Sequence, residues 1–166
     1  MKAINYLKII ILFLSIDLNA QSFEKILIEK RNIIPYPFNE YNAYFNNTLD
    51  IIYFNSSKNI NNVGGIKDLN DIWLRKKIEN IWGMPININE INTSENDLLL
   101  GVDEEFLYVL KGNNLTYFST KAPYIKIKEE EINGFNNNYS IISGSINKNK
   151  DIIYLSFDGI GSFGVE

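Results

Sequence analysis

Short apolar segments that alternate with polar residues recur along the chain, and turns rich in Asn and Gly separate them. Three of these segments share one plan, namely DIIYFNSS from Asp50, EFLYVLKG from Glu105 and DIIYLSFDG from Asp151. Their tyrosines, Tyr53, Tyr108 and Tyr154, lie roughly 55 and 46 residues apart. This spacing is typical of a four-stranded blade repeated around a β-propeller, so the pattern predicts an all-β fold.

The pattern divides the chain into about two and a half four-stranded antiparallel blades. We expect a first blade over residues 39–97, a second over 98–138 and an incomplete third over 139–166. The expected strands of the first two blades are 39–45, 50–57, 71–77 and 85–89, then 98–102, 105–112, 115–121 and 124–130, with an outer hairpin over 78–82. Because a closed propeller needs at least about four blades, the sequence predicts a fragment or a chain that a partner completes.

The first residues have the pattern of a secretory signal peptide. Lys2 and Lys8 precede an apolar run over residues 9–16, and the small Ala20 follows it. The run is far shorter than the ~20 residues that span a bilayer. We therefore expect a signal peptide over 1–20, a lead-in segment over 21–38 and a periplasmic or secreted product. A buried N-terminal strand of a cytosolic domain is the alternative.

Composition narrows the chemistry. The chain has 16 basic and 20 acidic residues, no histidine and no cysteine. It cannot form a Ser-His-Asp or Cys-His nucleophile, and it lacks the usual zinc ligands. It also shows no concentrated basic face of the kind that binds nucleic acid. We expect a protein that is not an enzyme and needs no cofactor.

Acidic residues leave two weaker alternatives. A glycosidase needs only two carboxylates about 5 to 10 Å apart, and the nearest candidates are Glu40, Asp97, Asp103 and Glu104. A second set, Asp68, Asp71 and Asp158, stands in Gly-rich turns and could gather around Ca²⁺. The regular Asp-x-Asp-x-Asp-Gly spacing is absent, however. We therefore expect Asp71 to accept hydrogen bonds from amides of its own turn.

One ordered set of motifs resembles a known family. The order Tyr-Phe-x-Ser-Ser, Gly-Gly, Asp-Ile-Trp, Trp-x-x-Pro is similar to the WD-like (TolB-type) propeller repeats of Bacteroidetes envelope proteins. The residues that carry the resemblance are Tyr53, Gly64, Gly65, Asp71, Trp73, Trp82 and Pro85, with Tyr108 and Tyr154 at later repeats. Gly64 and Gly65 are expected to supply positive φ angles. The aromatic residues expected to pack between adjacent sheets are Tyr53, Trp73, Trp82, Tyr108, Tyr117 and Tyr154.

The resemblance implies a rigid, exported scaffold that binds an envelope protein or glycan. The alternative is the N-terminal propeller of a larger enzyme, such as a prolyl-oligopeptidase-like peptidase, in which the propeller only filters substrates. Sequence beyond Glu166 would distinguish the two, because the enzyme requires a Gly-x-Ser-x-Gly elbow followed by a histidine.

Overall fold

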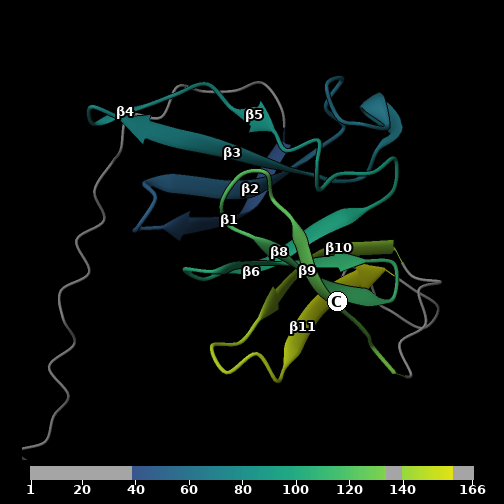
Figure 1. Cartoon of the computed structure of the whole chain (residues 1–166). Helices are drawn as coiled ribbons and strands as arrows, with labels where there is room; N and C mark the ends of the chain where they lie inside the picture. The colour runs from purple at the N-terminus through teal and green to yellow at the C-terminus, as the bar shows by residue number, and fades with distance from the viewer. Residues whose placement is uncertain (1–38, 134–139, 159–166) are drawn as a thin grey trace, which may run out of the picture. The chain divides into compact units, whose positions relative to one another are not determined.

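A computed structural model describes residues 39–133 and 140–158 (Figure 1). The predicted signal peptide and lead-in segment, residues 1–38, lie outside the described residues. The described part is all-β and antiparallel, and its only helix is a 3₁₀ turn, η1 (Gly65–Lys67). Within it, no helix is both long and apolar enough to cross a membrane.

The first sheet has the strand order β1-β2-β3-β4, with β5 also paired to β3. Its strands are β1 (Asn39–Asn46), β2 (Ile51–Ser57), β3 (Asp71–Ile78), β4 (Ile81–Trp82) and β5 (Ile86–Asn87). The last two strands pair with opposite ends of β3, so together they replace one continuous fourth strand. Pro85 lies in the gap between them, where its missing N–H costs no ladder hydrogen bond.

Two further sheets follow in chain order. The second is β6 (Asp97–Val102), β7 (Phe106–Lys111), β8 (Asn114–Ser119) and β9 (Lys126–Glu131), each paired with the next. The third is the hairpin of β10 (Ser140–Ile146) and β11 (Ile153–Asp158). This confirms the predicted all-β class, and the arrangement is consistent with a partial propeller of two complete sheets and part of a third.

The strands β6 and β7 of the second sheet bury both of their faces, whereas β9 is exposed along its whole length. In β7, Leu107 and Val109 point to one side, while Tyr108 and Leu110 point to the other, as the two-residue period of a strand requires. The first side joins a core with the first sheet, formed by Ile51, Tyr53, Ile72, Leu74, Ile88, Ile91, Leu99 and Phe118. The second side joins a core with the third sheet that includes Leu98, Leu100, Leu115, Ile146, Ile153, Leu155 and Phe157. Each sheet interface is therefore a continuous apolar layer.

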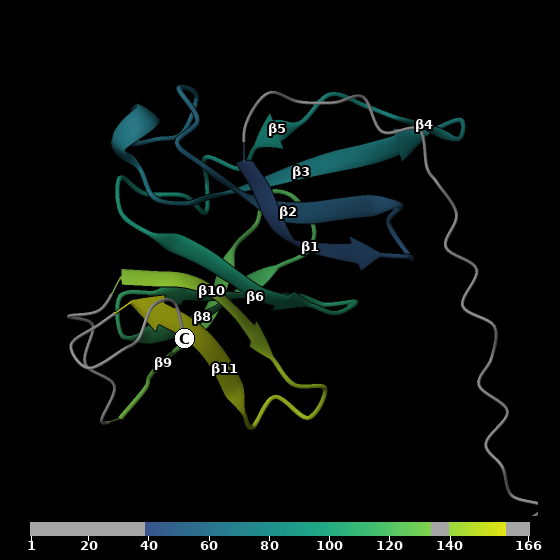
Figure 2. The same cartoon turned by 180° about the vertical axis from the view of Figure 1, so that it is seen from behind.

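The first strands of the three sheets lie next to one another (Figures 1 and 2). The side-chain amide of Asn42 in β1 donates to the carbonyl oxygens of Leu99 in β6 and Gly144 in β10, each at 3.3 Å. β1, β6 and β10 each contain a register shift of the bulge type. A bulge increases local twist and bends a strand. The repeated bulges thus accompany the convergence of the three first strands.

The three repeat tyrosines occupy corresponding positions but differ in burial. Tyr53 is fully buried against the second sheet, where its hydroxyl donates to the carbonyl of Thr120 at 2.8 Å. Tyr108 is 2% exposed and belongs to the core shared with the third sheet. Tyr154 is 59% exposed. The prediction that all three pack between sheets is therefore wrong for Tyr154, because no described strand covers its face of β11.

The two tryptophans are buried on the face of the first sheet that points away from the second. The side chain of Trp73 points to this face because its neighbour Leu74 faces the second sheet, and adjacent strand residues point to opposite faces. Its indole N–H donates to Asn62 Oδ1 at 3.0 Å. Trp82 packs edge-on against Phe45 of its own sheet, with ring centroids 5.8 Å apart. The prediction that these rings pack between adjacent sheets is wrong for the described sheets.

The repeat tyrosines provide a matched test of sheet stacking. Tyr108→Ala should lower the free energy of unfolding by about 3–5 kcal/mol, because it empties a buried site between two sheets. Tyr154→Ala should change it by less than about 0.5 kcal/mol, since its ring is already largely in solvent. Urea unfolding of both variants measures the difference. Equal losses would contradict the stacking described here.

Candidate functional site

Buried asparagine side chains join the first sheet to the second. Asn55 is fully buried in β2, and its Oδ1 accepts the backbone N–H of Leu99 at 2.9 Å. Its Nδ2 donates to the carbonyl of Asp97 at 2.8 Å. A carboxamide carries the same donor and acceptor as a peptide group, so Asn55 takes the place of one strand residue between β2 and β6.

Asn92 also replaces backbone partners with its side-chain amide. It lies in the crossing segment, residues 91–97, which leads from the first sheet to the second. Its Oδ1 accepts the N–H of Ile72, and its Nδ2 donates to the carbonyl of the same residue, both at 2.8 Å. Asn92 thereby fixes the crossing segment to β3. Buried backbone groups need partners, and here side-chain amides supply them.

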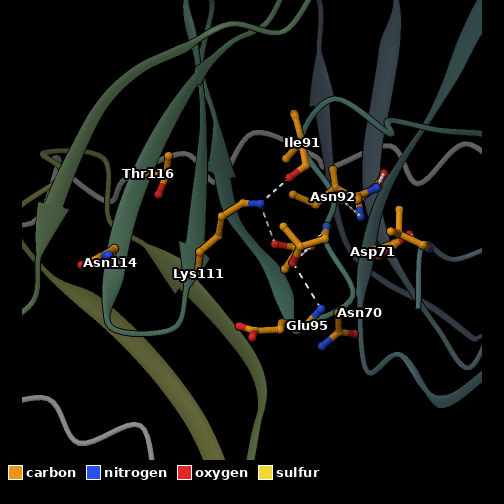
Figure 3. Close-up of polar contacts among 12 residues, drawn as sticks. Asn70, Asp71, Ile91, Asn92, Glu95, Lys111, Asn114 and Thr116 are labelled. Atoms are coloured by element: carbon orange, nitrogen blue, oxygen red, sulfur yellow. Dashed lines mark hydrogen bonds and ion pairs between the residues drawn. The ribbon is translucent and has the colours of Figure 1, made fainter. Parts of the chain in front are cut away.

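The crossing segment ends at a buried ion pair (Figure 3). Lys111 in β7 contacts Asp97 Oδ1 at 2.8 Å and also donates to the carbonyl of Ile91. The other carboxylate oxygen of Asp97 accepts the N–H of Thr93. Burial raises the pKa of Asp97, and the ammonium of Lys111 opposes that rise. Asp97 is 1% exposed, and these contacts compensate its buried charge. The ion pair therefore has a structural role.

Asp68 and Asp71 form a buried pair of carboxylates at the end of the loop that joins β2 to β3. Asp71 Oδ2 accepts the N–H of Val63 at 2.8 Å, and this bond to the loop that leads into β3 agrees with the prediction. It also accepts Nδ2 of Asn87 in β5 at 2.6 Å. Asp68 Oδ2 accepts the N–H of Gly64 at 3.0 Å. Burial raises the pKa of Asp71 to about 7, and the neighbouring Asp68 adds to the rise. Repulsion between the two carboxylates favours a proton on the pair.

The two loop glycines have different reasons to be glycine. Gly65 has φ +69°, as predicted. Gly64 has φ −84°, so the predicted positive angle is wrong there. A Cβ at Gly64 would lie 3.0 Å from Asp68 Oδ2 and 3.1 Å from the carbonyl oxygen of Ser94. The loop therefore needs glycine at position 64, where the backbone approaches the acidic pair and the crossing segment.

Two of the three residues of the predicted calcium set have described side chains. Asp68 and Asp71 lie together, but Asp158 belongs to β11 in the third sheet, and its side chain lies outside the described part. Among the described residues, no group of three or more acidic, His or Cys side chains could hold a metal ion.

Three of the four predicted carboxylate candidates are held in separate ion pairs. Glu40 contacts Arg75 at 2.9 Å, and Asp103 pairs with Lys150. Burial acts to raise the pKa of Asp103, but hydrogen bonds from Lys150, Tyr108 and two backbone amides lower it to about 2. Glu104 is exposed. Asp97 is bound to Lys111, so Glu40, Asp97 and Asp103 each have a different basic partner and are not gathered around one pocket.

A groove with an apolar floor lies between the first and second sheets. Its volume is about 530 Å³, within the ~300–1,000 Å³ range of ligand sites. Its apolar lining is Leu49, Ile51, Leu74, Ile86, Ile88, Ala122 and Tyr124. Its polar lining includes Lys76, Glu90 and Lys121, all three exposed. The groove thus combines an aliphatic floor with charged groups that remain in solvent.

Sequence reasoning did not identify this groove or the buried amides. The lining comes from β2, β3, the segment after β5 and the loop before β9, so no local motif marks it. Asn55 did leave a signal, because it stands within a strand pattern where asparagine is disfavoured.

Comparison with known proteins identifies no relative: no family model, no curated protein and no solved structure matches the chain.

The amide junction should be sensitive to truncation. Asn55→Ala leaves the N–H of Leu99 and the carbonyl of Asp97 without their buried partner, so the free energy of unfolding should fall by about 2–4 kcal/mol. Exposed Asn89 is the control, and Asn89→Ala should have an effect below about 0.5 kcal/mol. Urea unfolding compares the two variants. A small effect at Asn55 would show that the junction does not depend on its amide.

The acidic pair predicts a pH dependence of stability. The pKa of Asp71 in the folded protein, about 7, lies above its ordinary value of 3.8. The folded protein therefore binds this proton more tightly than the unfolded chain, and the stability gained is lost as the pH rises from about 4 through about 7. Between about pH 5 and about pH 8, the free energy of unfolding of the wild type should fall more than that of Asp71→Asn, which has no such proton. Parallel profiles would refute this.

Proposed function

We propose that the protein is an exported, non-enzymatic β-propeller module that acts as a binding scaffold in the cell envelope and holds a protein segment in the groove between its first two sheets. The observation that carries this proposal is the groove itself, an aliphatic floor next to charged groups in a chain without histidine or cysteine. The basic and apolar leader supports export, and the WD-like repeat motifs support the envelope as the site of action.

The chemistry of the floor favours a protein over a glycan. Glycan hydroxyl groups lose hydrogen bonds to water when they are buried, and aliphatic side chains cannot replace those bonds. Of the groove residues, only Tyr124 is aromatic, which leaves little surface for a sugar ring to stack on. An extended segment with one or two aliphatic side chains fits this floor, because it buries apolar surface.

The charged residues add a preference for sequence. Lys76 and Lys121 line the groove together with Glu90. Two positive groups against one negative group favour a segment that carries an acidic residue beside its apolar side chains. Such charges at the rim of an interface act mainly on selectivity and association rate.

Site-specific photocrosslinking in cells tests the proposal. A photoreactive amino acid at Ile86, which lines the groove and is 58% exposed, should give a discrete adduct with one protein. The same amino acid at Ile81, which is 70% exposed but outside the groove lining, is the matched control and should not. Lys121→Glu should weaken the adduct at position 86. Adducts of equal yield from both positions, adducts with wall glycan alone, or no adduct at position 86 would contradict the proposal.

A further inference from the structure

The loop between β2 and β3 turns its polar side chains inward and its apolar side chains outward. The buried positions are Asn59, Asn62 and Asp68, which are at most 5% exposed. The residue after each is aliphatic and exposed: Ile60 is 65%, Val63 48% and Leu69 51% exposed. Ile66, which follows Gly65, is 62% exposed. This is the reverse of the usual distribution of residue types.

The backbone accounts for the three-residue period. Three successive turns have i→i+3 hydrogen bonds, from the N–H of Asn62 to the carbonyl of Asn59, from Gly65 to Asn62 and from Asp68 to Gly65, at 2.9–3.0 Å. Ile60, Val63, Ile66 and Leu69 each follow one of these hydrogen-bonded residues along the ribbon of turns, and all four are exposed. The short helix η1 lies beyond the end of the strands in both views (Figures 1 and 2).

Buried polar contacts hold this ribbon in place. Asn62 binds Trp73 Nε1 and donates to the carbonyl of Ser56 at 2.9 Å. Asp71 and Asp68 accept the N–H groups of Val63 and Gly64. The exposed aliphatic residues are thus presented by an ordered loop, and their exposure is built into the fold. A concentrated group of exposed apolar side chains marks an interaction site.

The charges of the loop indicate what it meets. Within residues 57–70 the exposed charged residues are Lys58 and Lys67, because Asp68 is buried. The crossing segment, which approaches Gly64, adds one exposed acid, Glu95. The loop therefore presents aliphatic and cationic groups in a chain whose formal net charge is −4. That combination matches an anionic lipid surface, into which aliphatic side chains insert while lysines remain among the headgroups.

A protein partner fits this surface less well. Stable protein interfaces bury about 800 Å² on each side and depend on aromatic or arginine anchors. This loop has neither aromatic residues nor arginine, as its sequence SKNINNVGGIKDLN shows. A fluid bilayer requires no complementary shape. We infer that the β2–β3 loop is a membrane-contact loop, which inserts Ile60, Val63, Ile66 and Leu69 into the interface of an anionic bilayer.

Because the chain has no cysteine, an environment-sensitive fluorophore can be placed at a single introduced thiol. The full chain carrying Ile66→Cys is labelled and mixed with vesicles of phosphatidylglycerol and phosphatidylethanolamine. The dye should shift to the blue and brighten as it enters the bilayer. The matched control, Ile81→Cys on the β3–β4 hairpin, is 70% exposed in the native residue and should not respond. The apolar leader is common to both proteins, so it cannot produce a difference between the two positions.

A charge variant provides the second readout. Lys58→Gln with Lys67→Gln should raise the lipid concentration at half-maximal response about 30-fold, since each lysine near an anionic surface is worth about a five-fold change in affinity. No response at position 66, or an equal response at position 81, would overturn the inference. So would a response without vesicles that increases with protein concentration or with added envelope protein, because the loop would then be a protein contact. Groove crosslinking is read at Ile86 and does not depend on this result.

Discussion

The constraint on which the structure depends is that the second sheet must cover both of its faces with apolar side chains. β7 satisfies it by alternating residues that belong to two different cores, so the first and third sheets cannot be removed without exposing one of them. Stacking on both sides brings the first strands β1, β6 and β10 together. At that line there is little space: a Cβ on Gly144 would lie 2.7 Å from Leu100 Cδ2 and 2.8 Å from Leu155 Cδ2. The close approach of these strands therefore follows from the packing of the sheets.

Stacked sheets need connections, and the polar groups of those connections must be satisfied where they are buried. In this chain, side-chain carboxamides do that. Asn55, Asn62 and Asn92 each bind groups of another segment, and each is largely buried. The high asparagine content thus has a structural use beyond turns. The same inward direction of polar groups leaves the aliphatic residues of the β2–β3 loop exposed, and these residues form the proposed membrane-contact loop.

The strands could be predicted from sequence because their apolar residues alternate, and the positions of β1 to β3 and β6 to β9 follow that pattern closely. The break between β4 and β5 was also marked locally, by Pro85. The direction of the aromatic residues could not be predicted, because alternation says which residues share a face but not which face meets a neighbour. This is why Trp73 was misplaced, whereas Tyr154 is exposed because no described strand covers its face of β11. The groove could not be predicted either, because its lining comes from segments that are far apart in the sequence. Its two sides also come together only when the first and second sheets pack.

The most direct test of the account is a measurement of methyl contacts from β7 by nuclear Overhauser spectroscopy. The structure predicts that the methyl groups of Val109 contact residues of the first sheet, such as Ile51 and Ile72. Those of Leu110 should instead contact residues of the core between the second and third sheets, such as Leu98 and Leu115. Separate sets of contacts for these adjacent residues would support a sheet buried on both faces. Contacts from both residues to the same set of partners would contradict the stacked arrangement, and with it the groove and the membrane-contact loop that depend on it.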